Sequence, residues 1–206
     1  MLRNKTILEH TISCFARLEF VSQIIISTSK ERESEVASIL HSFSDTVEYL
    51  VVVVGGKERQ DSINNALLVV SESVSLVAVH DAVRPFISSE LIKKCSNCAQ
   101  EFGGAIIAVP AKDTIKEVEK DLIIKNTPDR SKLWQAQTPQ IFQKELLLSA
   151  YELAAKDNFI GTDDASLVEK VGGLVKVIEG DRRNLKITYP VDLKIAELIL
   201  DEMEEQ

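Results

Sequence analysis

Short apolar runs rich in β-branched residues alternate with amphipathic segments of helix length along most of this chain. The clearest run is YLVVVV at residues 49–54, which carries apolar side chains on both faces of a strand. Strands of this kind lie inside parallel sheets that helices cover on each side. A chain that repeats strand and helix in this way is expected to form a doubly wound α/β sheet.

The repeat predicts a definite order of elements. Strands are expected at residues 23–29, 49–54, 76–80, 104–110 and 174–180. Helices are expected at 31–43, at 61–73 with Asp61 or Ser62 as the cap, from Ser88 or Ser89, at 143–155, from the TDD start at 162–164, and from Pro190 to about Met203.

The alternation breaks between Ala111 and Pro139. There the segment DTIKEVEKDLIIKNT alternates charged and apolar residues around the polar turn at 119–121, which is typical of a β-hairpin. We expect a hairpin arm over 112–138 that projects from a single domain over 1–206. An isolated hairpin is marginal in water, so the arm should pack on another surface, such as a partner subunit.

Composition excludes several classes of function. The 206 residues suit one domain, and 24 Lys and Arg against 32 Asp and Glu give a net charge of −8. An acidic chain repels nucleic acid overall, although a local basic pocket can still bind a small anion. No apolar run approaches the ~20 residues that span a bilayer. The 3 cysteines are an odd, sparse set that indicates the cytoplasm; a plastid-targeted source stays open.

Polar residues follow the predicted strands, where an open α/β sheet binds its ligands. Gly55 and Gly56 follow strand 49–54 and precede a helix, so they form either a ligand-binding turn or a plain tight turn. Asp81 follows strand 76–80, and such a carboxylate is a natural Mg²⁺ ligand. Arg84 would then pair with a phosphate or, equally, with Asp81 to close the loop.

Two further residues have two interpretations each, and a third has one. Arg130 follows the hairpin, where no core requires it, and the alternative is a weak surface ion pair. Thr162 is explained by capping of the helix that follows. Lys186 lies between Leu185 and Ile187, so in a strand its side chain would point opposite to theirs, into solvent or into a site.

The chain closely resembles the 2-C-methyl-D-erythritol 4-phosphate cytidylyltransferase family. Seven motifs in the family's order carry the resemblance: TILEHT at 6–11, GGKERQDS at 55–62, VHDAVRPF at 79–86, DTIK at 113–116, DRSKLWQAQTPQ at 129–140, TDDASLVE at 162–169 and NLKITYPVDL at 184–193.

The resemblance implies a Rossmann-like nucleotidyltransferase fold whose hairpin arm clasps a second subunit in a homodimer. It implies cytidylyl transfer from CTP to methylerythritol phosphate, with release of pyrophosphate and Mg²⁺ held by Asp81. By position, Gly55, Gly56 and Ser62 would contact the cytosine, Arg84, Thr114, Thr138 and Thr162 would line the substrate pocket, and Arg130 and Lys186 would fix the substrate's phosphate. Arg130 is expected to come from the partner's arm.

The family begins with a strand and a Gly-rich loop that carries an Arg and a Lys, whereas this chain matches from a point just beyond them. We therefore expect a chain that is truncated at its N-terminus relative to the family, with a sheet neighbour left unpaired. Two alternatives remain at this stage. One is the related ribitol-5-phosphate cytidylyltransferase, and the other is a non-catalytic binding subunit with the same fold.

Overall fold

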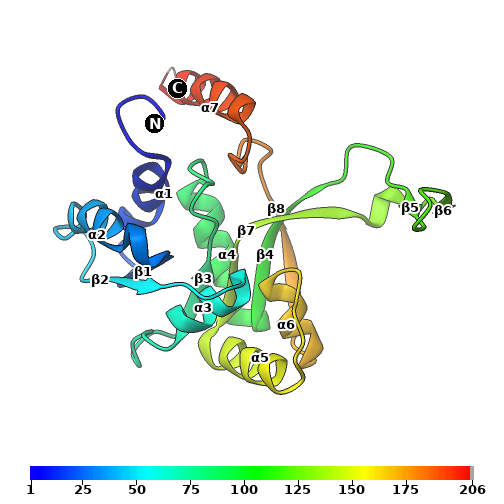
Figure 1. Ribbon diagram of the computed structural model, residues 1–206, viewed down its shortest axis with the longest axis horizontal. Helices are drawn as coiled ribbons and strands as arrows, with labels where there is room; N and C mark the ends of the chain where they lie inside the picture. Colours follow the sequence, from blue (N-terminus) through cyan, green and yellow to red (C-terminus); the bar gives the residue numbers. More distant parts are fainter. Residues whose placement is uncertain (205–206) are drawn as a thin grey trace.

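The N-terminal part of the molecule is a two-stranded parallel sheet with its helices. The computed structural model describes residues 1–204 (Figure 1). This part contains α1 (Ile7–Ala16), β1 (Gln23–Thr28), α2 (Glu33–His41), β2 (Tyr49–Val54) and α3 (Arg59–Leu67), with β1 parallel to β2. Ile12 of α1 and Leu40 of α2 form a buried cluster with Ile24 and Ile26 of β1, so both helices cover one face of these strands.

The second sheet has four strands in the order β3-β7-β4-β8. Its elements are β3 (Leu76–Val79), α4 (Ser89–Phe102), β4 (Gly104–Pro110), β7 (Trp134–Gln143), α5 (Lys144–Lys156), α6 (Asp164–Lys170), β8 (Val175–Glu179) and α7 (Pro190–Glu204). β4 and β8 are parallel, but β7 runs antiparallel to both β3 and β4. The predicted α/β class is confirmed, and the sheet is mixed, because β7 runs antiparallel between its two neighbours.

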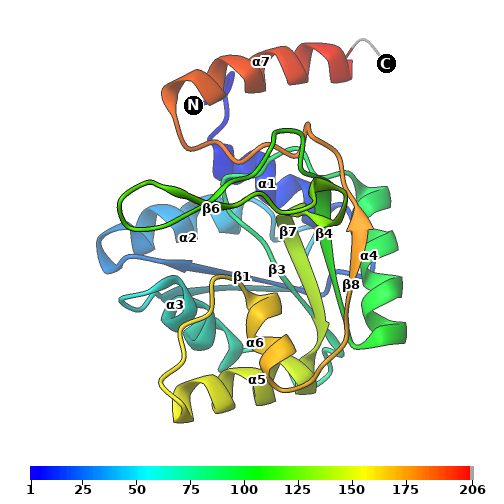
Figure 2. The same ribbon diagram turned by 90° about the vertical axis from the view of Figure 1, so that its right-hand side faces the viewer.

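Adjacent residues of β7 anchor the two faces of this sheet. Ile141 packs with Cys95 and Ala99 of α4 on one face, while Phe142 packs with Leu147 of α5 on the other. Successive strand side chains point to opposite faces, so one strand serves both cores. Each large side chain buried in this way contributes about 1.5–3 kcal/mol. Figure 2 shows the sheet between these helix layers.

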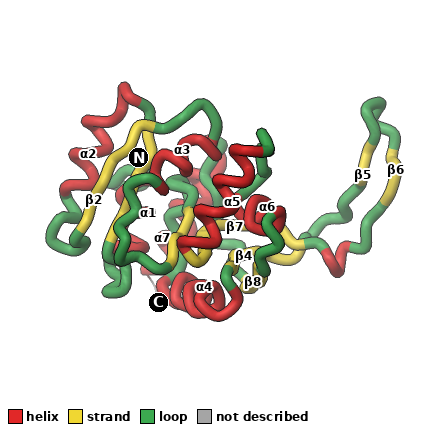
Figure 3. Tube along the Cα trace, turned by 90° about the horizontal axis from the view of Figure 1, so that it is seen from below, coloured by secondary structure: helices red, strands yellow, loops and turns green. Residues whose placement is uncertain are grey.

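The arm is a short hairpin formed by β5 (Glu117–Val118) and β6 (Ile124–Asn126), which projects away from the sheets (Figures 1 and 3). The turn lies where the sequence predicts it, with the Leu122 N–H donating to the Glu119 carbonyl at 3.0 Å. The predicted arm boundary at residue 138 is wrong, because 134–138 already belong to β7. Gln135, for example, pairs with Val109 of β4.

Several helix boundaries also differ from the predictions. Helix α1 was not predicted, although Thr6 and Glu9 form a capping box at its start. Helix α3 runs over Arg59–Leu67 rather than 61–73, and neither Asp61 nor Ser62 caps it. Asp61 instead lies in the first turn, where its carboxylate accepts the Glu58 N–H at 3.1 Å.

The chain's two ends meet near the carboxyl ends of the strands. Leu2, which is fully buried, packs with Ile187 and with Ala196 and Ile199 of α7. This cluster fixes the segment before α7 beside the loop that follows β3, as Figure 2 shows. Within the described residues no helix combines the length and the apolar character needed to cross a membrane.

Candidate active site

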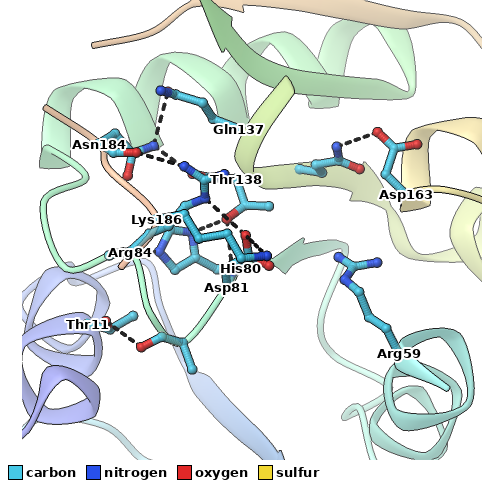
Figure 4. A network of polar contacts seen from close by, with 12 residues as sticks. Thr11, Arg59, His80, Asp81, Arg84, Gln137, Thr138, Asp163, Asn184 and Lys186 are labelled. Carbon is cyan, nitrogen blue, oxygen red and sulfur yellow. Dashed lines mark hydrogen bonds and ion pairs between the residues drawn. The ribbon is translucent and has the colours of Figure 1, made fainter. Parts of the chain in front are cut away.

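The candidate site is built around Asp81, in the loop after β3. One oxygen of its carboxylate, Oδ2, lies 3.0 Å from Arg84 Nε and 3.2 Å from Lys186 Nζ (Figure 4). Burial alone would raise the pKa of Asp81, but the hydrogen bond from Arg84 and the charge of Lys186 hold it below its ordinary value. Asp81 is therefore ionised at neutral pH, between two cations.

A chain of hydrogen bonds fixes the backbone at Asp81. The Asp81 N–H donates to Thr138 Oγ1 at 2.9 Å, and the Thr138 hydroxyl lies 3.1 Å from His80 Nδ1. His80 Nε2 lies 3.0 Å from the Arg84 carbonyl, which can only accept. The imidazole must then carry its proton on Nε2 and accept at Nδ1, so the threonine hydroxyl donates there.

His80 is neutral for a physical reason. Burial lowers its pKa to about 4, and its ring packs edge-on against Phe15 at a centroid distance of 4.9 Å. No role for this histidine follows from the sequence alone. The structure gives it one, because it joins the end of β3, Thr138 of β7 and the Arg84 backbone.

The segment before α7 supplies the rest of the site. Arg84 donates to the Asn184 carbonyl at 2.8 Å, and the buried Asn184 side chain donates to the Thr138 carbonyl at 2.9 Å. No strand forms around Lys186, because the backbone there is irregular. The Ile187 N–H donates to the Val83 carbonyl at 2.9 Å, and the half-exposed Lys186 side chain reaches Asp81 from this segment.

The glycine turn after β2 packs tightly on the first turn of α3. The Gly56 N–H donates to Ser62 Oγ at 3.0 Å, and that hydroxyl donates to the Glu58 carbonyl at 3.1 Å. A Cβ on Gly56 would lie 2.2 Å from Asp61 Cβ, so a larger residue would displace the turn. The turn is therefore tight, as both interpretations of the sequence require. The contact of this turn with cytosine stays a prediction.

Sequence reasoning missed Arg59. This residue is the first of α3, and its guanidinium lies 2.7 Å from a carboxylate oxygen of Asp164, which is fully buried. Asp164 also accepts the Tyr151 hydroxyl at 2.6 Å. Burial alone would lower the pKa of Arg59, but Asp164 and, more weakly, Asp81 raise it. The available signal was an arginine within the GGKERQDS motif.

Thr162 is near Arg59 but does not cap α6. The N-cap is Asp163, whose carboxylate accepts the Ser166 N–H at 2.9 Å, so the capping explanation of Thr162 is wrong. Thr162 and Arg59 both line a small recess of about 80 Å³. Thr162 is thus not used for capping, and it shares this recess with Arg59.

Thr114 and Arg130 are not brought to Asp81 within one chain. Both belong to the arm, and Arg130 donates to the Lys112 carbonyl at 2.7 Å. The arm projects away from the sheets (Figure 3).

The residues present fit only one kind of metal site. Among residues 1–204, no three His, Cys, Asp or Glu side chains are grouped to hold an ion. Asp81 offers a single, partly buried carboxylate at a strand end. Mg²⁺ commonly takes one or two carboxylates and completes its shell with water and substrate phosphates. Asp81 therefore fits a Mg²⁺ ion that arrives with a polyphosphate.

Known proteins are similar to this chain over nearly its whole length. The sequence profile of 2-C-methyl-D-erythritol 4-phosphate cytidylyltransferase matches residues 1–202. The enzyme of that name from Caldanaerobacter subterraneus is 42% identical over 201 residues, which cover 97% of this chain and 88% of that protein. The one from Geotalea uraniireducens is 44% identical over 206 residues, which cover 97% and 86%.

Solved structures agree. The 4-diphosphocytidyl-2C-methyl-D-erythritol synthase of Anaerococcus prevotii superposes with a TM-score of 0.88 at 32% identity, covering 98% of this chain and 88% of that one. The Thermus thermophilus cytidylyltransferase gives 0.83 at 29% identity, covering 98% and 92%. This chain belongs to the 2-C-methyl-D-erythritol 4-phosphate cytidylyltransferase family.

Proposed function

We propose that this protein transfers the cytidylyl group of CTP to 2-C-methyl-D-erythritol 4-phosphate and releases pyrophosphate. The observation that carries the proposal is the Asp81 carboxylate, held between Arg84 and Lys186 at the end of β3. Two cations around one carboxylate leave the cluster with a net positive charge, which favours phosphate groups in a chain that is acidic overall.

In this reaction, a phosphate oxygen of methylerythritol phosphate attacks the α-phosphorus of CTP. A new P–O bond forms as the bond between that phosphorus and the bridging oxygen of the β-phosphate breaks, and the electron pair leaves with pyrophosphate. Catalysis then consists mainly of positioning and of electrostatic stabilisation. Mg²⁺ held by Asp81 would neutralise charge on the triphosphate oxygens.

The side chains divide this work. Lys186 and Arg84 hold the attacking phosphate close to the α-phosphorus, and Lys186 is free to shift toward it because its side chain is 45% exposed. Arg59 adds a third cation, fixed in place by the buried Asp164. Thr138 acts by positioning, since its hydroxyl is already engaged by the Asp81 N–H and by His80.

The Gly55-Gly56 turn and Ser62 are proposed to contact the cytosine, and Thr162 to line the polyol pocket beside Arg59. The turn lies directly after β2, at the carboxyl edge of the sheet where ligands bind. The three cysteines are all free thiols, which supports a cytoplasmic location.

The arm supports a homodimer. Its hairpin carries apolar side chains that are strongly exposed in one chain, namely Val118, Leu122, Ile123 and Ile124, with exposures of 48%, 80%, 63% and 57%. A patch of this kind indicates an interface. In the dimer, the arm of one subunit would carry Thr114 and Arg130 to the site of the other.

The function is tested by comparing two acceptors. The protein expressed from its complete gene, so that any residues encoded before Met1 are present, is incubated with CTP, Mg²⁺ and either methylerythritol phosphate or ribitol 5-phosphate. Pyrophosphate release should be faster with methylerythritol phosphate. Faster release with ribitol 5-phosphate would show that ribitol 5-phosphate is the acceptor instead. No release with either acceptor would favour a non-catalytic binding subunit.

A further inference from the structure

The first turn of α3 carries two side chains that reach across to the other half of the molecule. Arg59 pairs with the buried Asp164 at 2.7 Å. The next residue, Gln60, is half-buried; its Nε2 donates to the Phe159 carbonyl at 3.1 Å, and its Oε1 accepts the Gly161 N–H at 3.0 Å. Both side chains therefore fasten α3 to the loop that leads into α6, which lies beside it in Figure 2.

The α6 end of this loop is fixed by β7. The buried Gln140 donates to Asp163 Oδ2 at 2.8 Å and accepts the Ala165 N–H at 3.0 Å. Asp163 is the N-cap of α6, so these bonds hold the start of the helix against the sheet. Both bonds lie at the cap or beyond it, so the residues before the cap need another support.

Thr162 lies immediately before this cap. Within residues 1–204, the only hydrogen bond of the segment 160–162 is the one that the Gly161 N–H donates to Gln60. The Ile160 side chain is 69% exposed, so packing holds the segment weakly. A short segment with little burial and one hydrogen bond takes its position from that bond. Gln60 therefore sets where Thr162 lies.

The support of Gln60 is itself fixed, because the start of α3 is tied to the end of β2. The Gly56 N–H donates to Ser62 Oγ at 3.0 Å, and the Asn65 side chain donates to the Val54 carbonyl at 3.0 Å. A side chain can position a loop only when its own backbone is held in place. Gln60 meets this condition, and the same turn of helix holds the proposed cytosine contacts.

We propose that Gln60 is a positioning residue for the acceptor, which places Thr162 in the methylerythritol phosphate pocket through the Gly161 N–H. This inference rests on the proposed function, in which Thr162 lines that pocket. An amide suits the task, because it donates and accepts and so bonds to a carbonyl and an N–H at once. Methionine has a similar length and keeps the packing, but it loses both bonds.

The test measures the binding of methylerythritol phosphate by isothermal titration calorimetry. The protein from the complete gene is first saturated with Mg²⁺ and cytidine 5′-(α,β-methylene)triphosphate, in which a CH₂ group replaces the bridging oxygen, so no transfer occurs. Gln60→Met should raise the Kd of the acceptor by about five- to ten-fold, the range expected for one lost hydrogen bond. Wild-type affinity in this variant would overturn the proposal.

Turnover with CTP gives a second readout. Thr162 is proposed to contact the polyol rather than the reacting phosphate, so its displacement weakens binding in the ground state and the transition state alike. Gln60→Met should therefore raise KM for methylerythritol phosphate and change kcat by less than about two-fold. A fall in kcat with an unchanged KM would contradict the positioning role.

Gln23→Met is the matched control. Gln23 also donates to one carbonyl, of Val69 at 2.9 Å, and accepts one N–H, of Ser71 at 2.9 Å. It lies at the start of β1, whereas the glycine turn bonds to the last residue of that strand, Thr28. The control should leave the acceptor Kd within about two-fold of wild type, with circular dichroism checking that both variants fold. An equal rise in both variants would indicate general loosening and would overturn the proposal.

A double-mutant cycle with Thr162→Ala separates positioning from a direct contact. Thr162→Ala should itself weaken acceptor binding, and in that background Gln60→Met should add less than about two-fold. If the two effects multiplied instead, Gln60 would act elsewhere and its assignment to Thr162 would be wrong.

The calorimetry needs no turnover, which separates this proposal from the proposed function. A wild type that binds the acceptor but releases no pyrophosphate would refute the transfer, and the Gln60 comparison would still decide the positioning role. Normal pyrophosphate release without an effect of Gln60→Met would refute the positioning role alone. A wild type that does not bind methylerythritol phosphate would overturn the positioning role as well.

Discussion

The ammonium group of Lys186 lies 3.2 Å from a carboxylate oxygen of Asp81, although the two residues come from segments far apart in the sequence. The contact depends on the irregular backbone before α7, which the Ile187 N–H ties to the Val83 carbonyl. It places a half-exposed cation at the site where we expect negative charge to develop.

Replacing Lys186 with methionine should therefore affect catalysis more than folding. We expect kcat/KM for pyrophosphate release to fall by about 10²–10³, because a cation that stabilises developing charge is lost. Stability should change by less than ~1 kcal/mol, since the pair is partly solvated. Lys194→Met, at an exposed position on α7, is the matched control. Wild-type turnover in the Lys186 variant would remove this residue from the mechanism.

The Tyr151–Asp164 contact predicts a loss of stability. Tyr151→Phe removes a 2.6 Å hydrogen bond to a fully buried carboxylate and should cost about 1.5–3 kcal/mol in urea unfolding. Asp164→Asn should cost more, because Arg59 then loses its buried partner. Tyr189→Phe, at a 70% exposed position, should be neutral. Unchanged stability in Tyr151→Phe would show that the contact contributes nothing.

His80 predicts a pH dependence of folding. Its pKa is about 4 in the folded protein against an ordinary value of 6.5, so the unfolded chain binds the proton more readily. The contribution of His80 is complete above pH 6.5 and is lost as pH falls toward 4, by roughly 3 kcal/mol.

The control for this prediction is His80→Asn, which removes the titrating ring. The unfolding free energies of the wild type and the variant should converge as the pH falls through this window, because only the wild type loses the contribution of His80. The carboxylates change the stability of both proteins equally. A constant difference between the two proteins from pH 7 to pH 4 would contradict the assignment of a neutral, buried imidazole.

The arm predicts how the protein assembles. Ile123 is 63% exposed at the hairpin, and Ile123→Lys should dissociate the proposed homodimer in sedimentation equilibrium at micromolar concentration. Leu174→Lys, which is 68% exposed before β8, should leave the dimer intact. A wild-type protein that sediments as a monomer would refute the arm's role and the delivery of Arg130 to a partner's site.

The elements that could be predicted from the sequence are those whose local apolar pattern matches their burial in the fold. The β-branched runs of β1, β2, β3, β4 and β8 all form strands, because each packs under helices that the amphipathic segments supply. β7 was missed because Gln135, Gln137, Pro139 and Gln140 interrupt its apolar pattern. Two of these side chains are satisfied by tertiary partners: Gln137 donates to the Asp181 carbonyl, and Gln140 bonds to Asp163 and to the Ala165 N–H.

The candidate site was predictable only in part. Asp81 and Arg84 follow a strand, so their position at the carboxyl edge could be inferred, and the structure shows that they pair. Lys186 and Arg59 reach the site through tertiary contacts with the loop after β3 and with Asp164, which no local pattern encodes. The neutral state of His80 likewise depends on burial against Phe15 and on Thr138.

The most direct test of the central claim is the rate of pyrophosphate release from CTP and methylerythritol phosphate by Asp81→Asn. The substitution keeps the shape of the side chain but removes the charge that lies between Arg84 and Lys186. The protein from the complete gene should form the cytidylylated product, and the variant should do so at least about 10²-fold more slowly. Equal rates in the two proteins would show that cytidylyl transfer does not take place at Asp81.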